Sequence, residues 1–329
     1  MMPADHIRHL RRQEIDSLKW DACIASAPNG LIYARTFYLD EMTSGQWDAL
    51  VFDDYRAVMP LTWNRKFGFY YLYQPFCTPC LGVFGDGFPV SAFLQAIPRK
   101  FKYWDIDLNE ANGSSSEPAI TASSVIPATR PLRITTRANQ LLRLDREPEE
   151  MERYYNRLAR RMCKGAREGH LDILRDVGPR DVIDLYRKEY GGRHPRLGTK
   201  DYERLTSVAE KAFLKKQART YLALWPDGAI AAFYLVLSDD KFVYSTLGGS
   251  TQKGKEISAF YLLTDAAIKD HAGSGRVFRF EGSDIPGIAS FNASFGSTPV
   301  YYPHLLMNDL PFPVNMLKNR QGIYQNKHE

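Results

Sequence analysis

Apolar and polar positions alternate most regularly in the second half of the chain. Three apolar runs are separated by the tight turns PDG and DDK, which predicts antiparallel strands joined by hairpins. Apolar residues then recur at helical spacing up to a glycine, and a further strand and a short helix follow. The predicted order is strand, strand, strand, helix, strand and helix, over residues 218–225, 229–238, 242–249, 251–273, 276–282 and 286–296.

The first half repeats this order without visible sequence identity. A helix over 15–27, with Asp16 as its cap, precedes the first copy, and the polar, Gly- and Ser-rich segment 109–119 is expected to be a loop. We therefore predict an α/β protein of two tandem units, 1–144 and 145–329, each a mostly antiparallel mixed sheet with flanking helices. The strands and helix expected in the first copy are 47–52, 57–66, 69–76, 90–101 and 103–108.

Composition narrows the class of protein further. The chain has 329 residues, is 44% hydrophobic and carries a net charge of +5, which fits a globular protein and gives no reason to expect DNA binding. It has no signal-peptide pattern and no apolar stretch approaching the ~18 residues of a membrane span, so a cytoplasmic location is expected.

The four cysteines do not suggest a disulfide framework. Cys77 and Cys80 form a CTPC motif, which is either half of a metal or redox site or two small apolar residues lining a loop. A zinc site needs two more ligands, and no second cysteine pair or close histidine pair supplies them, so no metal is expected.

Between the two copies lies a long predicted helix with a basic face. Tyr155, Leu158, Met162 and Ala166 are predicted to form its opposite, apolar face. The basic face is either an ordinary solvated surface or a site for an anion such as a phosphate-bearing donor, an RNA backbone or an acidic partner. Its residues are Arg153, Arg157, Arg160, Arg161, Lys164 and Arg167, with no acid among them.

Three segments carry a family resemblance. They are YNRLARRMCKGAREGHLDIL, LGGSTQKGKEISAFYLLTDAAI and FRFEGSDIPGIASFNASFG followed by VYY. Together with the strand order they resemble the GNAT acyltransferase fold, and in particular its tandem FemABX-like branch, including a group of bacterial proteins within it. The resemblance implies transfer of an activated acyl group, from acyl-CoA or aminoacyl-tRNA, to an amine on a small molecule or peptide, with no tightly bound cofactor.

The resemblance also implies a donor site where the third strand of the second copy meets its helix. In the family, a pyrophosphate sits on backbone amides at the start of that helix, which suits an anion because those amides are unpaired. Gly254 matches the first glycine of the family pattern, whereas Thr251 and Glu256 depart from it. The residues expected to contact the donor are Gly249, Ser250, Lys253, Gly254 and Lys255.

The segment FRFEGSDIPGIASFNASFG is expected to form the other wall of the site. Glu281, at the end of its strand, either acts as a general base or amine ligand, or caps the next helix or pairs with an arginine. Asn292 occupies the place where relatives hold a tyrosine or a lysine. Its amide can donate a hydrogen bond to an oxyanion, or the site has lost its chemistry. Tyr244 is a candidate proton donor, as are Tyr301 and Tyr302 after the helix; each is otherwise a packing residue.

Two functions are therefore open on the sequence alone. The first is an acyl or aminoacyl transferase that uses Glu281, Asn292 and Tyr244. The second is a non-catalytic module that keeps the fold to bind a ligand or a protein.

Overall fold

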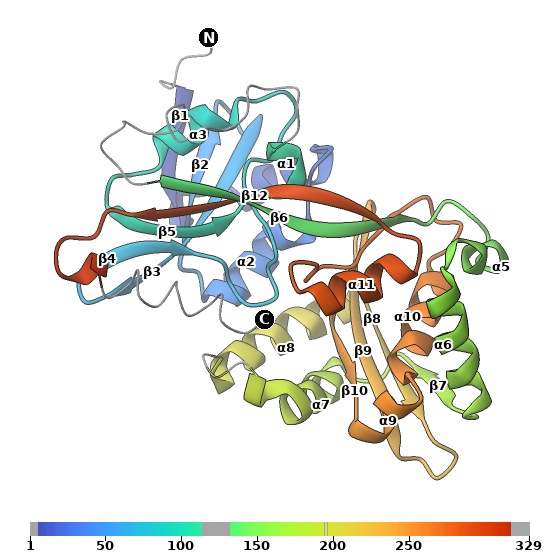
Figure 1. Ribbon diagram of the computed structural model, residues 1–329. Helices are drawn as coiled ribbons and strands as arrows, with labels where there is room; N and C mark the ends of the chain where they lie inside the picture. Colours follow the sequence, from blue (N-terminus) through green and yellow to red (C-terminus); the bar gives the residue numbers. More distant parts are fainter. Residues whose placement is uncertain (1–5, 114–131, 194, 196, 317–329) are drawn as a thin grey trace. The chain divides into compact units, whose positions relative to one another are not determined.

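The computed structural model describes residues 6–113, 132–193, 195 and 197–316 (Figure 1). Most of the predicted loop at 109–119 lies outside these residues. The chain divides into two compact units. The first holds the described residues up to Thr136 together with those from Tyr302 onward, and the second runs from Arg137 to Tyr301.

The strands of the first unit follow the order β1-β2-β3-β4-β5-β12. All neighbours are antiparallel except β4 and β5, which are parallel because helix α3 carries the chain back between them. Asp16 caps α1 as predicted, accepting from the amides of Leu18 and Lys19. The elements are β1 (Ile7–Arg11), α1 (Ser17–Ser26), α2 (Thr36–Thr43), β2 (Trp47–Phe52), β3 (Ala57–Lys66), β4 (Phe69–Tyr73), α3 (Val90–Ala96), β5 (Phe101–Asp107) and, from the far end of the chain, β12 (Thr298–Asn308).

The strands of the second unit follow the order β7-β8-β9-β10-β11-β6. Again a single pair, β10 and β11, is parallel, and helices α9 and α10 connect it. The elements are β6 (Leu132–Arg143), α5 (Pro148–Met151), α6 (Arg157–Glu168), β7 (Asp172–Arg175), α7 (Pro179–Tyr190), α8 (Thr199–Leu214), β8 (Ala218–Leu224), β9 (Ile230–Ser238), β10 (Phe242–Ser250), α9 (Gln252–Glu256), α10 (Ala259–Asp270), β11 (Val277–Arg279) and α11 (Pro286–Ser294).

The predicted repeat is confirmed, with one exchange that the sequence did not suggest. Position by position, β1 to β5 correspond to β7 to β11, and the sixth place is taken by β12 in the first unit and by β6 in the second. The sixth strand of each unit therefore comes from the other half of the chain. As a result the chain passes from one unit to the other twice, once within β6 and once within β12. The sequence predicted a single boundary, after residue 144.

Two predicted helices are broken. The helix expected over 251–273 is split into α9 and α10, because Ser258 takes a left-handed conformation with φ of 58°. The long basic helix is interrupted by extended backbone at Tyr155, and Asn156 caps a new helix, α6, by accepting from the amide of Ala159. No helix of the described residues is long and apolar enough to cross a membrane.

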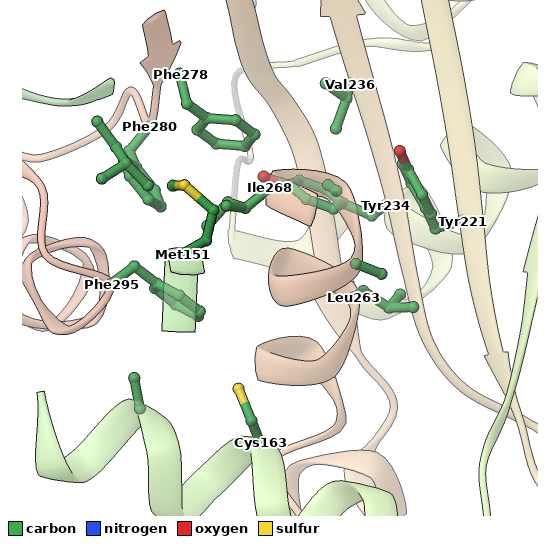
Figure 2. Close-up of a cluster of buried hydrophobic side chains, with 14 of the residues drawn as sticks. Met151, Cys163, Tyr221, Tyr234, Val236, Leu263, Ile268, Phe278, Phe280 and Phe295 are labelled. Carbon is green, nitrogen blue, oxygen red and sulfur yellow. The ribbon is translucent and has the colours of Figure 1, made fainter. Parts of the chain in front are cut away.

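The core of the second unit lies between its sheet and helices α6, α10 and α11 (Figure 2). Phe295 is fully buried and makes ring contacts with Tyr155, Phe280, Tyr261 and Phe291. Helices α7 and α8 pack on the other face of the sheet (Figure 1). Successive glycines of β10 show the two faces directly. An added Cβ on Gly248 would meet Phe260 of α10, whereas one on Gly249 would meet Tyr190 of α7.

The apolar face of the basic helix differs from the predicted one at Leu158. This residue is 36% exposed, whereas Ala159 and Cys163 are buried, because the break at Tyr155 sets the face that α6 presents to the core. We therefore expect Leu158→Ala to change the free energy of unfolding by no more than about 0.5 kcal/mol. The matched change Leu263→Ala, at a fully buried position of α10, should cost about 2–5 kcal/mol. Urea unfolding measures both, and equal costs would contradict this packing.

Candidate functional site

Strands β10 and β11 pair over only three residues. Phe242, Val243 and Tyr244 lie opposite Val277, Phe278 and Arg279, and β10 then continues to Ser250 without β11 beside it. The register of β10 against β9 also shifts between Ser245 and Leu247, which marks a β-bulge. Bulges re-aim the backbone and are common next to functional sites. The second unit thus places an unpaired strand edge directly after a parallel pair.

Glu281 lies where β11 ends and is held in a strained turn. Its φ is 57°, in the left-handed region, and Gly282 follows with φ of 66°. Such backbone at a non-glycine residue costs about 1–3 kcal/mol and persists only when its surroundings fix it. Here Asn139 of β6 fixes it twice, since its Oδ1 accepts from the Glu281 amide at 2.9 Å and its Nδ2 donates to Oε2 at 2.8 Å.

The carboxylate of Glu281 is also part of a buried ion pair. Oε1 accepts from Nε of Arg279 at 2.9 Å, and the Arg279 side chain is fully buried. The guanidinium lies 5.3 Å from the centre of the Phe242 ring. Arg279 is the last residue of β11, and the left-handed turn two residues later brings the Glu281 carboxylate against it. The arginine partner considered on the sequence is therefore a near neighbour in the chain.

Asn292 supports the same turn. It is buried, and its Nδ2 donates to the Glu281 carbonyl at 3.2 Å and to Oγ of Ser283 at 3.0 Å. Both amide hydrogens are therefore used within the protein. In this arrangement the side chain orders the turn between β11 and α11, and it would have to release one of these bonds to donate to an oxyanion.

The predicted proton donors are also placed by the structure. The Tyr244 hydroxyl is buried and donates to Asp239 Oδ2 at 2.6 Å. Tyr301 is 61% exposed, whereas Tyr302 is buried and belongs to the first unit. Glu281 and Asn292 thus come together, while Tyr244 is engaged with the β9–β10 turn.

The predicted donor segment is a short, closely packed turn of helix. The amide of Gly254 donates to the Thr251 side chain at 3.2 Å, so Thr251 caps α9. A Cβ on Gly254 would lie 1.9 Å from the carbonyl oxygen of Ala231 in β9, so glycine is required here for packing alone. Lys253 and Lys255 are exposed. This segment therefore offers two cations, while the Gly254 amide is already bonded within the protein.

The comparisons with known proteins identify the fold. No protein-family model matches the chain, and no curated protein matches it in sequence. A crystal structure of FemX superimposes with a TM-score of 0.62 at 12% identity, covering 94% of this chain and 99% of that one. The chain has a FemX-like tandem GNAT fold.

Two further structures share this fold. L-PGS from Bacillus licheniformis gives a TM-score of 0.53 at 13% identity, covering 93% of this chain and 96% of that chain. A conserved protein of unknown function from Bacteroides thetaiotaomicron gives 0.53 at 13% identity, covering 89% and 98%. The predicted fold resemblance is thereby confirmed, and it extends over nearly the whole chain.

The basic face of the FemX-like fold is smaller than predicted, and it is not free of acids. Arg153 lies before the break, near Glu150 at 3.6 Å, and Lys164 lies 3.8 Å from Glu168. Arg167 is committed to the core network described next. Three basic residues of α6 are exposed and make no ion pair with the described residues: Arg157, Arg160 and Arg161.

Arg167 joins α6 to α10 through buried acid. Its guanidinium donates to both carboxylate oxygens of Glu152 and, at 2.8 Å, to Asp265, which is 4% exposed. Lys269 and the Tyr155 hydroxyl complete the network by donating to Asp265 at 2.9 and 3.0 Å. Hydrogen bonding from Arg167 lowers the pKa of Glu152. Arg167, which the sequence places on the basic face with no acid among its residues, therefore pairs with two carboxylates, because Asp265 of α10 and Glu152 lie against it.

The cysteines make no disulfide among the described residues. Burial raises the pKa of the Cys77 thiol, which disfavours the reactive thiolate. Within the described ranges, no group of three His, Cys, Asp or Glu side chains could hold a metal ion.

Sequence reasoning did not find Asn139 or Tyr190. Asn139 lies 142 positions from Glu281 in the chain, and no local pattern connects the two. Tyr190 is the last residue of α7, and its hydroxyl contacts the backbone of Ser250. Only Arg279 had a signal, since it lies two residues before Glu281 in the chain.

Gly254→Ala should destabilise the protein by about 1–3 kcal/mol, because the new methyl group would overlap the Ala231 carbonyl. Gly165→Ala is the matched control. Gly165 is a helical glycine of α6 with no atom within 4 Å of an added Cβ, so alanine there should stabilise the protein by up to about 1 kcal/mol. Urea denaturation measures both. A neutral Gly254→Ala would show that α9 does not pack against β9 in this way.

Arg167→Met should lower the free energy of unfolding by about 1–2 kcal/mol at pH 7, less than for a fully enclosed pair because the arginine side chain is 41% exposed. The pKa of Glu152 is lower in the folded state than in the unfolded state. Its contribution is therefore complete above the ordinary glutamate pKa of about 4.3 and is lost as the pH falls through the folded value.

The stability difference between the wild-type protein and Arg167→Met should consequently narrow below about pH 4. Urea unfolding at a series of pH values measures it, with Arg161→Met on the exposed face of α6 as the control. A difference that stays constant with pH would contradict the ion pair.

Proposed function

We propose that the protein transfers an activated acyl or aminoacyl group to an amine, and that transfer takes place in the second unit beside the unpaired edge of β10. The observation that carries this proposal is the strained backbone of Glu281, which several hydrogen bonds hold in place. It lies where the pairing of β10 and β11 ends, in a FemX-like fold. The similarity to FemX supports the fold. The strained backbone at Glu281 supports the site, because the folded protein keeps this residue in place despite an unfavourable conformational energy.

The chemistry required is modest. The amine nitrogen attacks the acyl carbonyl, a C–N bond forms, the bond to the carrier breaks, and a proton passes from the amine to the departing carrier atom. Arg279 and Asn139 donate to different oxygens of the Glu281 carboxylate, and an ionised carboxylate offers about four lone-pair sites for hydrogen bonds. Glu281 can therefore also hold the attacking amine, and catalysis would depend mainly on positioning.

The donor would carry phosphate. Lys253 and Lys255 are exposed at α9, and Arg157, Arg160 and Arg161 are exposed on α6. The start of α6 is tied to the end of α11, since the Asn156 amide donates to the Ser294 carbonyl at 2.8 Å. These cations suit acyl-CoA or aminoacyl-tRNA, whose phosphates they would neutralise.

A second candidate function has a specific observation behind it. The three predicted catalytic residues all form hydrogen bonds to other groups of the protein; they are Asn292, Tyr244 and Glu281. A module that binds a ligand without transfer chemistry would look the same, so the test has to separate binding from turnover.

Thermal unfolding with candidate donors tests binding. A donor that binds the folded state raises the melting temperature by mass action. We expect stabilisation by acetyl-CoA or by aminoacyl-tRNA, and stabilisation by the RNA should weaken as salt is added. If neither donor raises the melting temperature, the proposed transfer function is wrong.

Glu281→Gln, assayed with the donor that binds, should then lose most of its transfer to amine acceptors while still binding that donor. Asp284→Asn is the control, a partly exposed carboxylate three residues along the same turn. Circular dichroism must show both variants folded, because Glu281 neutralises a buried arginine. Donor binding without transfer by the wild-type protein would favour the binding module.

A further inference from the structure

The backbone of Ser250 faces the unpaired side of β10. Ser250 lies opposite Ala232 of β9, and the next residue, Thr251, donates its amide to the Ala231 carbonyl at 3.0 Å. Hydrogen-bonded and non-hydrogen-bonded pairs alternate along antiparallel strands. The N–H and C=O of Ser250 therefore point away from β9, toward the side on which β11 no longer pairs.

Tyr190 fills this position. Its hydroxyl donates to the Ser250 carbonyl at 3.0 Å and accepts from the Ser250 amide at 3.1 Å. Gly249 makes room for the ring, since an added Cβ there would lie 2.4 Å from it. One side chain thus satisfies both backbone groups that a partner strand would otherwise take.

The surroundings of Tyr190 include two cations without acidic partners. The guanidinium of Arg193 lies 4.8 Å from the centre of the Tyr190 ring, and Nζ of Lys255 lies 5.3 Å from it. Both side chains are exposed, and neither makes an ion pair with the described residues. An anion placed beside this tyrosine would meet positive charge from two different segments, the turn after α7 and the helix α9.

Tyr190 is positioned by its ring as well as by its hydroxyl. The ring stacks on Tyr186 and packs edge-on against Phe233, and Gly191 and Gly192 follow the residue at the end of α7. The two hydrogen bonds of its hydroxyl are neutral, and each contributes only about 0.5–1.5 kcal/mol net. A ligand that offers one donor and one acceptor in the same place can therefore compete with it.

We propose that Tyr190 determines which donors the site accepts, by occupying the Ser250 backbone until a donor displaces it. The fitting donor has an amide in an extended arm, which pairs with Ser250 as an added strand would, and a phosphate that Arg193 and Lys255 bind. This inference rests on the proposed function in assuming that the donor binds along β10. It adds that the free protein opposes binding through one named hydroxyl.

Calorimetric titration of the full chain with coenzyme A and with ADP tests the proposal. Coenzyme A has phosphates and an amide-bearing arm, whereas ADP has phosphates alone. Tyr190→Phe removes the competing hydroxyl and should tighten coenzyme A binding about threefold to tenfold, the equivalent of roughly one hydrogen bond, and leave ADP binding unchanged. Arg193→Gln should weaken both ligands. Tyr154→Phe, an exposed tyrosine of the same unit, should change neither.

Gly249→Ala provides an independent variant, because its methyl group would push the Tyr190 ring off the strand while the hydroxyl remains. It should tighten coenzyme A binding in the same direction. Hydrogen exchange gives a readout in the free protein: the Ser250 amide should exchange faster in Tyr190→Phe, and coenzyme A should slow it again.

Unchanged or weaker binding of coenzyme A by Tyr190→Phe would overturn the proposal, as would failure of both the wild-type protein and Tyr190→Phe to bind it. Transfer from another donor in the assay described above would then still support the proposed function, so the two failures are distinguishable.

Discussion

The buried ion pair of Arg279 and Glu281 is the interaction on which the site in the second unit depends. A fully buried arginine cannot lose its charge, and breaking such a pair leaves that charge uncompensated, which is strongly destabilising. The pair therefore fixes where β11 stops. Asn139 from β6 and Asn292 from α11 then hold the left-handed turn at Glu281 through its amide, carbonyl and carboxylate. Residues of β6, β11 and α11 thus converge on Glu281, and the one from β6 lies 142 positions away in the chain.

The end of β11 in turn leaves part of β10 without a neighbouring strand. Backbone groups at a strand edge need partners, and the structure supplies one for Ser250 from a side chain, the Tyr190 hydroxyl. A side chain that bonds to a strand edge can move away by breaking one or two hydrogen bonds, whereas removing a paired strand breaks many. Under the proposal above, a ligand takes over the Ser250 backbone groups when it displaces the Tyr190 hydroxyl.

The sequence predicted much of this architecture because hairpins and amphipathic helices leave local patterns. The strands that became β8, β9 and β10, the helix α1 with its Asp16 cap, and the repeat of the two units could all be read from spacing and turns. The short strand β1 and the helix α2 were missed. The sequence did not show the exchange of β6 and β12, because pairing between residues far apart in the chain decides which strand takes the sixth place in each unit.

For the candidate site, the sequence by itself indicated that Glu281 and Asn292 lie on either side of one turn, and that Gly254 lies near the start of a helix. Only the tertiary structure decided what these residues do. Asn139 and Tyr190 reach the site from other elements. Asp265 forms an ion pair with Arg167, and the Ala231 carbonyl leaves room only for glycine at position 254. The physical reason is that hydrogen bonds and ion pairs depend on distances of about 3 Å between groups, and the chain sets those distances only once it has folded.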